Sequence, residues 1–106
     1  MIHQYLTRHL DEISQLCLRY RVSRLYAFGS LVDGRFEAGK SDVDLLVEFD
    51  KSELSKKEIA RSLLELWIEL QELLQCKVDL ITTDKIKGDF FKKYLNLYKE
   101  LIYSKT

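Results

Sequence analysis

The sequence predicts a small α/β (α+β) fold, in which helices flank a mixed β-sheet of three or more strands. Two observations lead to this prediction. Short apolar runs of strand length alternate with longer segments whose apolar residues recur every three or four positions. The 106 residues also contain no proline and no low-complexity linker, so residues 1–106 should form one domain around one core. The predicted order of elements is α-β-β-α-β-α.

The first half of the chain predicts one helix and two strands. Apolar residues at helical spacing predict a helix over about the first twenty residues: Leu6, Leu10, Ile13, Cys17 and Tyr20. Residues 24–28 and 43–49 are apolar runs that predict strands. Between them, the polar segment 31–40 contains two glycines and predicts a short helix or turn followed by a loop.

The second half predicts two helices and a third strand. Ser55 and Glu58 have the spacing of a capping box, and an apolar stripe behind them predicts a helix over 55–75. Residues 77–82 predict a strand. Two apolar stripes predict a C-terminal helix over 90–103. That helix should either pack between the two earlier helices or expose a surface for a partner.

Composition narrows the class of protein. Acidic and basic residues balance at 17 each, which argues against bulk binding of long nucleic acid. The N-terminus lacks the apolar core of a signal peptide, and no apolar run has the length of a membrane span. Cys17 and Cys76 form no CxxC motif and are expected to be reduced thiols. We therefore expect a cytoplasmic protein that does not bind membranes.

Three aspartates lie at or inside predicted strands, where aspartate is depleted. Asp42 and Asp44 are two residues apart and should project from the same face of a strand, and Asp79 lies in the next strand along the chain. If Asp79 lies level with them, three carboxylates converge, and two like charges at 4 Å repel by about 4 kcal/mol at an effective dielectric of 20. A bound proton or a cation must offset this repulsion. Oxygen ligands alone suit Mg²⁺.

A glycine and a serine follow the first predicted strand. Gly29 adds no side-chain bulk, so a phosphate can approach the backbone closely. Ser30 offers a hydroxyl and a backbone N–H at the start of the next predicted turn. A glycine and a serine after a strand are a weak signal alone. They become a strong one here because an Asp-x-Asp strand follows them and Val78-Asp79-Leu80 comes later in the chain.

Together, Phe28-Gly29-Ser30, Ser41-Asp42-Val43-Asp44-Leu45-Leu46-Val47 and Val78-Asp79-Leu80 resemble the signature of the DNA polymerase β nucleotidyltransferase superfamily. The short chain is similar to its minimal nucleotidyltransferase (MNT) branch. The resemblance implies the nucleotidyltransferase fold, with Gly29 and Ser30 holding a nucleoside triphosphate. It implies that Asp42 and Asp44 bind two Mg²⁺ ions, and that Asp79 binds one of them and helps to deprotonate the attacking hydroxyl.

The sequence also departs from the family pattern. Leu31 stands where many relatives carry a basic residue after the serine. Arg35 or Lys40 would then supply that charge from the loop. Arg35 and Ser41 accordingly join Gly29 and Ser30 as candidate nucleotide-binding residues.

Two functions of different class follow from the resemblance. MNT proteins typically occur beside a HEPN-domain toxin, and some transfer AMP from ATP to a tyrosine of that toxin. The first hypothesis is therefore a metal-dependent protein adenylyltransferase that acts as an antitoxin. The alternative is a nucleotide-binding antitoxin without catalysis, which neutralises its partner by forming a complex. In either case the C-terminal helix is the expected contact for a HEPN protein or for a homo-oligomer.

Two simpler interpretations of single aspartates stay open. Asp42 alone has the position of a turn residue that closes the loop before its strand. Asp79 alone has the position of a surface partner for Lys77 or for a neighbouring arginine.

Overall fold

The computed structural model describes residues 4–33, 35–37, 40–83, 86 and 88–105. In chain order, the elements are α1 (Gln4–Thr7), α2 (Leu10–Arg19), β1 (Val22–Phe28), α3 (Ser30–Asp33), β2 (Val43–Phe49), α4 (Lys56–Leu74), β3 (Val78–Thr82), α5 (Asp89–Tyr98) and β4 (Glu100–Ser104). No helix in these ranges is both long enough and apolar enough to cross a membrane.

The strands form one four-stranded sheet with the order β3-β2-β1-β4. β1 pairs antiparallel with both β2 and β4, whereas β2 and β3 run parallel. Parallel neighbours need a crossover connection, and α4 supplies it. The predicted mixed sheet flanked by helices is confirmed.

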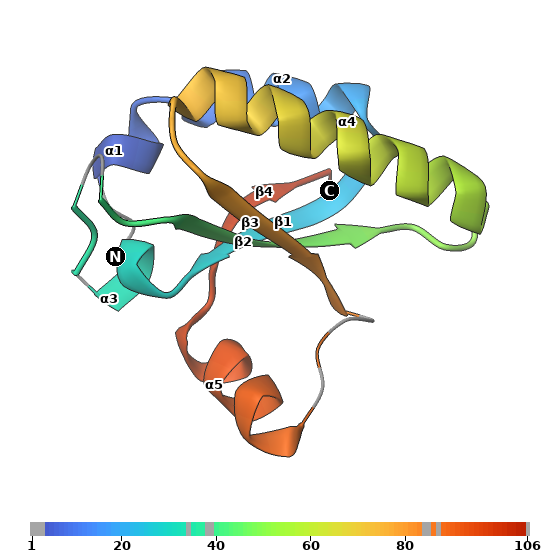
Figure 1. Ribbon diagram of the computed structural model, residues 1–106. Coiled ribbons are helices and arrows are strands. Elements are labelled where there is room, and N and C mark those ends of the chain that lie inside the picture. Colours follow the sequence, from blue (N-terminus) through green and yellow to red (C-terminus); the bar gives the residue numbers. More distant parts are fainter. Residues whose placement is uncertain (1–3, 34, 38–39, 84–85, 87, 106) are drawn as a thin grey trace.

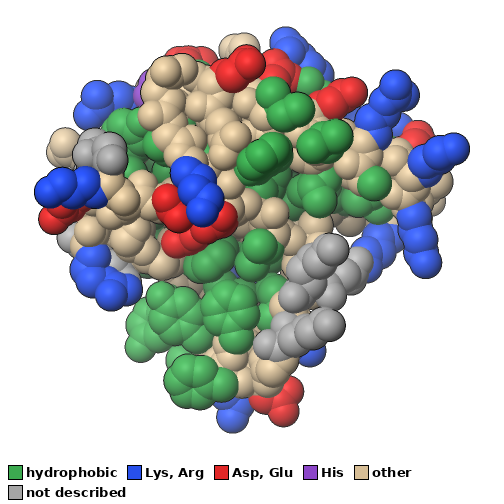
Figure 2. Space-filling view, in the orientation of Figure 1, with side chains coloured by type: hydrophobic (Ala, Val, Ile, Leu, Met, Phe, Trp, Pro, Cys, Tyr) green, Lys and Arg blue, Asp and Glu red, His purple; other side chains and the backbone are tan. Residues whose placement is uncertain are grey.

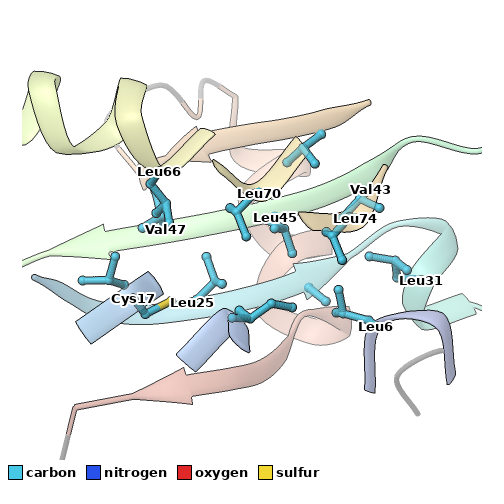
Figure 3. Close-up of a cluster of buried hydrophobic side chains, with 14 of the residues drawn as sticks. Leu6, Cys17, Leu25, Leu31, Val43, Leu45, Val47, Leu66, Leu70 and Leu74 are labelled. Atoms are coloured by element: carbon cyan, nitrogen blue, oxygen red, sulfur yellow. The ribbon is translucent and has the colours of Figure 1, made fainter. Parts of the chain in front are cut away.

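The helices cover opposite faces of the sheet (Figure 1). α2 and α4 lie on one face, and α5 lies on the other. The main core fills the space between the sheet and the first pair, where leucines of α4 meet β2 and β1 (Figure 3). A smaller apolar cluster of Phe28, Leu46 and Leu95 joins α5 to the opposite face. The structure therefore has three layers, with the sheet in the middle.

α4 begins and ends with defined caps. The Ser55 hydroxyl accepts a hydrogen bond from the Glu58 N–H at 3.2 Å, and the Ser55 N–H donates to the Glu58 carboxylate at 3.0 Å. Gln75 ends the helix in the left-handed conformation, with φ +53°. The predicted capping box is confirmed, and the predicted helix 55–75 agrees with the observed one to within its two caps.

α4 also covers part of the outer edge of β3. The N–H of Val78 donates to the Gln71 side chain at 3.1 Å, and the Trp67 indole N–H donates to the Val78 carbonyl at 2.7 Å. Unpaired backbone groups at a sheet edge invite association with other chains, and these two side chains satisfy both groups of Val78.

The C-terminal prediction was wrong in two respects. The helix over 90–103 ends at Tyr98, and residues 100–104 form strand β4 beside β1. Lys99 is extended, with ψ 143°, so the chain leaves the helix there. The apolar residues 101–103 fit a strand as well as a helical turn, and pairing with β1 decides between them. The alternative in which this helix packs between the two earlier helices is also wrong, because the sheet separates them (Figure 1).

The N-terminal prediction also needs a correction. The single helix over the first twenty residues is divided into α1 and α2 around His9. Leu6 and Ile13 lie on either side of the break, and both are buried in the main core. The apolar spacing predicted which residues are buried but not the interruption.

Candidate functional site

The alternation of β2 divides its side chains between the two faces of the sheet. Val43, Leu45 and Val47 are buried in the main core under α2 and α4. Leu46 packs in the small cluster under α5. Because side chains alternate along a strand, Asp44 shares the α5 face with Leu46. The apolar residues of β2 thus fix the face on which this carboxylate lies.

The parallel pairing of β2 and β3 brings two of the predicted carboxylates together. Asp44 is the register partner of Asp79. Their side chains are joined by a hydrogen bond, and the charge of Asp42 also acts on Asp44. The structure therefore brings Asp44 and Asp79 together, with Asp42 near Asp44 at the same end of the two strands. Figure 2 shows acidic side chains gathered near the middle of the molecular face, above hydrophobic side chains in the region of α5.

The surroundings of Asp44 oppose its ionisation. Burial, then the charge and the hydrogen bond of Asp79, then the charge of Asp42 raise the pKa of Asp44 from 3.8 to about 6. A hydrogen bond between two carboxyl groups needs one shared proton.

Asp42 is oriented by a lysine. Its carboxylate lies 3.7 Å from the Lys77 ammonium group, and both side chains are largely exposed. Lys77 was the expected alternative partner of Asp79, and the ion pair that the structure shows is with Asp42 instead. Within the described residues, no group of three or more His, Cys, Asp or Glu side chains is gathered as a metal-binding cluster.

Gly29 is required by both its backbone and its neighbour. It has φ +69°, a conformation that favours glycine. A Cβ built at Gly29 would lie 2.5 Å from a carboxylate oxygen of Asp44. The turn after β1 therefore touches the carboxylate pair directly. The sequence predicted a glycine that admits a phosphate, and the structure adds a contact with Asp44.

The loop residues between β1 and β2 have mixed positions. Ser30 begins α3 and is partly exposed, whereas Leu31 is buried in the core. Leu31 therefore occupies the position after the serine with a packing side chain. The hydroxyl of Ser41 accepts from the Glu37 N–H at 3.0 Å and closes the loop, so its observed contact is internal. Arg35 is exposed, and Lys40 pairs with Glu37 at 3.6 Å.

A row of aromatic rings, which the sequence interpretation missed, extends from the site along α5. Phe28 is the register partner of Asp44 on β1, and its ring meets Phe91 edge-on with centroids 6.2 Å apart. Phe91 stacks with Tyr94 at 6.3 Å, and Tyr94 is followed by Tyr98 at 5.1 Å. The spacing 91, 94 and 98 is a one-face helical pattern and was available as a signal. Only the fold shows that this face begins beside the carboxylates.

The donors at this site fit a divalent cation. They are all oxygen atoms, the ligands that Mg²⁺ prefers. Asp44 and Asp79 already lie close enough to share a proton, and a cation would relieve the repulsion that raises the pKa of Asp44. Asp42 would complete the set by releasing Lys77.

Comparison with known proteins agrees with this geometry. Residues 6–102 match the family model of the nucleotidyltransferase domain. Two proteins of Methanocaldococcus jannaschii, named as candidate protein adenylyltransferases MJ1379 and MJ0126, are 35% and 31% identical to the chain. The first alignment covers 80% of this chain and 79% of MJ1379, and the second covers 96% of this chain and 93% of MJ0126.

Solved structures share the fold. One described as a candidate minimal nucleotidyltransferase is 26% identical, with a TM-score of 0.66, and the match covers 94% of this chain and 95% of that one. A toxin–antitoxin structure with AMP-PNP is 20% identical, with a TM-score of 0.66 over 92% of this chain and 74% of that one. A complex of a tri-AMPylated Shewanella oneidensis HEPN toxin with its MNT antitoxin is 18% identical, with a TM-score of 0.59 over 92% of this chain and 71% of that one. The last two similarities establish the fold alone.

We predict that Gly29→Ala displaces the Asp44 carboxylate. Gly88→Ala is the control for alanine at positive φ, because Gly88 has φ +89° but no atom within 4 Å of a Cβ built on its backbone. Both variants should lose stability in chemical denaturation, because alanine is strained at positive φ. Only Gly29→Ala should change the Asp44 pKa, which carboxyl-carbon NMR should show falling toward 3.8. An Asp44 pKa that is unchanged in Gly29→Ala, or that changes equally in Gly88→Ala, would contradict the contact.

The raised pKa of Asp44 predicts how stability depends on pH without metal. The folded chain holds the Asp44 proton between pH 3.8 and about 6, whereas the unfolded chain releases it. Its contribution to stability is therefore full below pH 3.8 and lost as the pH rises through 6. In EDTA, Asp44→Asn should be more stable than the unmodified chain by ~1 kcal/mol at pH 8, after allowance for partial solvent exposure. The difference should shrink on acidification to pH 4. A constant difference in urea denaturation across this range would refute the assignment.

Proposed function

Because the chain belongs to the nucleotidyltransferase domain family, we propose that it transfers AMP from ATP to a tyrosine hydroxyl of a HEPN-type toxin and acts as the antitoxin. The relatives named as candidate protein adenylyltransferases support protein as the acceptor. The structures of an AMPylated HEPN toxin and of a complex with an ATP analogue support the nucleotide and the partner.

The observation that carries the proposal is the contact of three features at one end of the sheet. They are the hydrogen-bonded pair of Asp44 and Asp79, the adjacent Asp42, and the bare backbone of Gly29 against Asp44. A turn without side-chain bulk beside paired carboxylates has room for a polyphosphate and has the ligands for its counter-ions.

Two Mg²⁺ ions would supply charge neutralisation for the triphosphate and for the leaving pyrophosphate. Asp42 and Asp44 would hold both ions, and Asp79 would hold one. Gly29 and Ser30 would hold the phosphates, with Ser41 keeping its loop closed behind them. Arg35, exposed on the same loop, is the candidate for a further phosphate contact.

The reaction is a displacement at the α-phosphorus of ATP. The tyrosine oxygen forms a new bond to that phosphorus, and the bond to the pyrophosphate oxygen breaks. Asp79 orients the hydroxyl and accepts its proton as the bond forms. The rigid register of β2 and β3 fixes the carboxylates before substrate binds, so catalysis consists mainly of positioning and charge stabilisation.

The acceptor protein should dock on α5. Phe90 and Leu97 are 87% and 75% exposed, which is unusual for apolar side chains of this size. The aromatic row leads from this helix to Phe28, the register partner of Asp44. A helical partner that covers α5 would present its tyrosine at the carboxylates.

We predict that Asp44→Asn abolishes AMP transfer but keeps the fold. The amide cannot replace a charged oxygen ligand, yet it keeps nearly the same shape and hydrogen bonds with Asp79. Incubation of the chain with ATP, Mg²⁺ and a purified HEPN-domain protein, the proposed partner, should add AMP to that partner, as read by intact mass. Asp11→Asn, at an exposed position on α2, is the control and should behave like the unmodified chain. Neutralisation of the toxin without any mass increase, by both the unmodified chain and Asp44→Asn, would establish the binding-only antitoxin instead.

If the partner docks on α5, a substitution there should slow labelling of the partner without changing nucleotide binding. Phe90→Ser should weaken the complex with the HEPN protein and slow its labelling by about tenfold, whereas the thermal shift produced by ATP and Mg²⁺ should stay unchanged. Leu18→Ser is the control, since Leu18 is 71% exposed on α2, on the other side of the sheet. Equal labelling rates for the two variants would exclude α5 as the docking surface.

A further inference from the structure

A second apolar surface lies on the opposite side of the sheet from α5. Three large apolar side chains of α4 remain exposed: Leu64 at 57%, Trp67 at 38% and Ile68 at 44%. With Ala60 and Gln71 they fall on one side of the helix, at the positions i, i+4, i+7, i+8 and i+11. We call these five residues the α4 flank. Figure 2 shows hydrophobic side chains gathered over α4 on this face.

The α4 flank continues into a groove. A cavity of about 590 Å³ lies between the first half of α4 and the ends of β2 and β3. Ala60 and Leu63 line it from the helix, and Val47, Phe49 and Thr82 line it from the strands. The exposed stripe and the groove thus offer both a projecting apolar surface and a recess beside it.

Most charges of α4 run against its own dipole. Lys56, Lys57 and Arg61 lie in its first half together with the capping Glu58, whereas Glu65, Glu69 and Glu72 lie in its second half, with no basic residue in the last turn. Basic groups near a helix N-terminus and acidic groups near its C-terminus are unfavourable for the isolated helix. Figure 2 shows the Lys and Arg side chains at the right, where α4 begins. When a second copy of α4 packs antiparallel to the first, the basic half of each helix lies beside the acidic half of the other, and the charge distribution becomes favourable.

We propose that two copies of this chain form a two-fold symmetric dimer, with their α4 flanks packed antiparallel. A two-fold interface uses the same patch on both subunits, so that patch must be complementary to itself. An apolar centre with basic groups at one end and acidic groups at the other meets this requirement. The axis passes near Leu64, which lies seven residues after Lys57 and eight before Glu72. Lys57 of each copy then faces Glu72 of the other.

Two further details support a second copy of this chain as the protein that covers the α4 flank. Trp67 is held in place by its indole bond to the Val78 carbonyl, so it offers a large ring at little entropic cost. Glu69 is engaged by Arg19 at 3.3 Å, whereas neither Lys57 nor Glu72 forms an ion pair with another described residue. α5 lies across the sheet, so the dimer leaves the proposed acceptor surface uncovered (Figure 1). The two proposals are therefore independent.

Sedimentation velocity of the purified chain over a range of concentrations tests the dimer. The unmodified chain should associate to a dimer. Ile68→Glu should remain monomeric at concentrations where the unmodified chain is dimeric, because it places a charge in the apolar centre. Leu97→Glu on α5 is the matched control and should still form the dimer. Circular dichroism verifies that both variants are folded.

A charge-reversal pair makes the test specific. Lys57→Glu alone and Glu72→Lys alone should each weaken the dimer by about tenfold, because like charges then face each other. A mixture of the two variants should form a heterodimer, because the mixed pair restores opposite charges at both ends of the interface. A loss of folding cannot produce this rescue.

Three results would overturn the proposal. The first is a monomer at every concentration. The second is a dimer that Leu97→Glu dissociates and Ile68→Glu does not, which would move the interface to α5. The third is a monomeric chain whose complex with the HEPN protein is lost in Ile68→Glu, which would assign the α4 flank to that partner.

Discussion

The position of β2 between β1 and β3 is the constraint on which the site depends. β2 pairs antiparallel with β1 and parallel with β3, and both registers meet at Asp44, opposite Phe28 on one side and Asp79 on the other. A slip of one residue in either pairing would turn the Asp44 carboxylate from the α5 face to the core. Val43, Leu45 and Val47 prevent such a slip, because it would expose all three. The hydrophobic core under α2 and α4 therefore holds the carboxylates in place on the opposite face of the sheet.

The close approach of the carboxyl groups also lowers the stability of the fold. Burial, the neighbouring Asp79 and the charge of Asp42 raise the pKa of Asp44 to about 6, so the ionised carboxylate is destabilised near neutral pH. Repulsion of this kind between carboxylates is typical of sites that bind a cation. The core supplies the stability that allows it.

The sheet also separates two surfaces with different properties. α5 carries aromatic and apolar side chains that continue to the carboxylates through Phe28, and this is the surface proposed for the acceptor protein. α4 carries an apolar centre between opposite charges, as a symmetric contact requires. Because a sheet lies between them, a small domain can hold a partner on one face and a second copy on the other without competition.

The sequence determined the elements that its apolar spacing marks strongly. β2 and the capped helix α4 were predicted nearly to the residue, because a buried run and a capping box are local signals. The three aspartates and the Gly-Ser turn were also identifiable, because acidic residues at strand positions are out of place. The family followed from these motifs, and the family model matches residues 6–102.

Only the tertiary structure decided the rest, because it depends on contacts between distant residues. β4 became a strand because β1 offers it an edge, and the chain from 100 to 104 has no local feature that distinguishes this from a helical turn. Lys77 pairs with Asp42 and not with Asp79, its second neighbour in the chain, because strand pairing brings Asp42 within its reach. The aromatic row of α5 begins at the site, and the α4 flank stays uncovered, because the sheet directs the two helices to opposite faces. Local spacing determines which face of an element is apolar, but only the packing of the whole chain determines what that face meets.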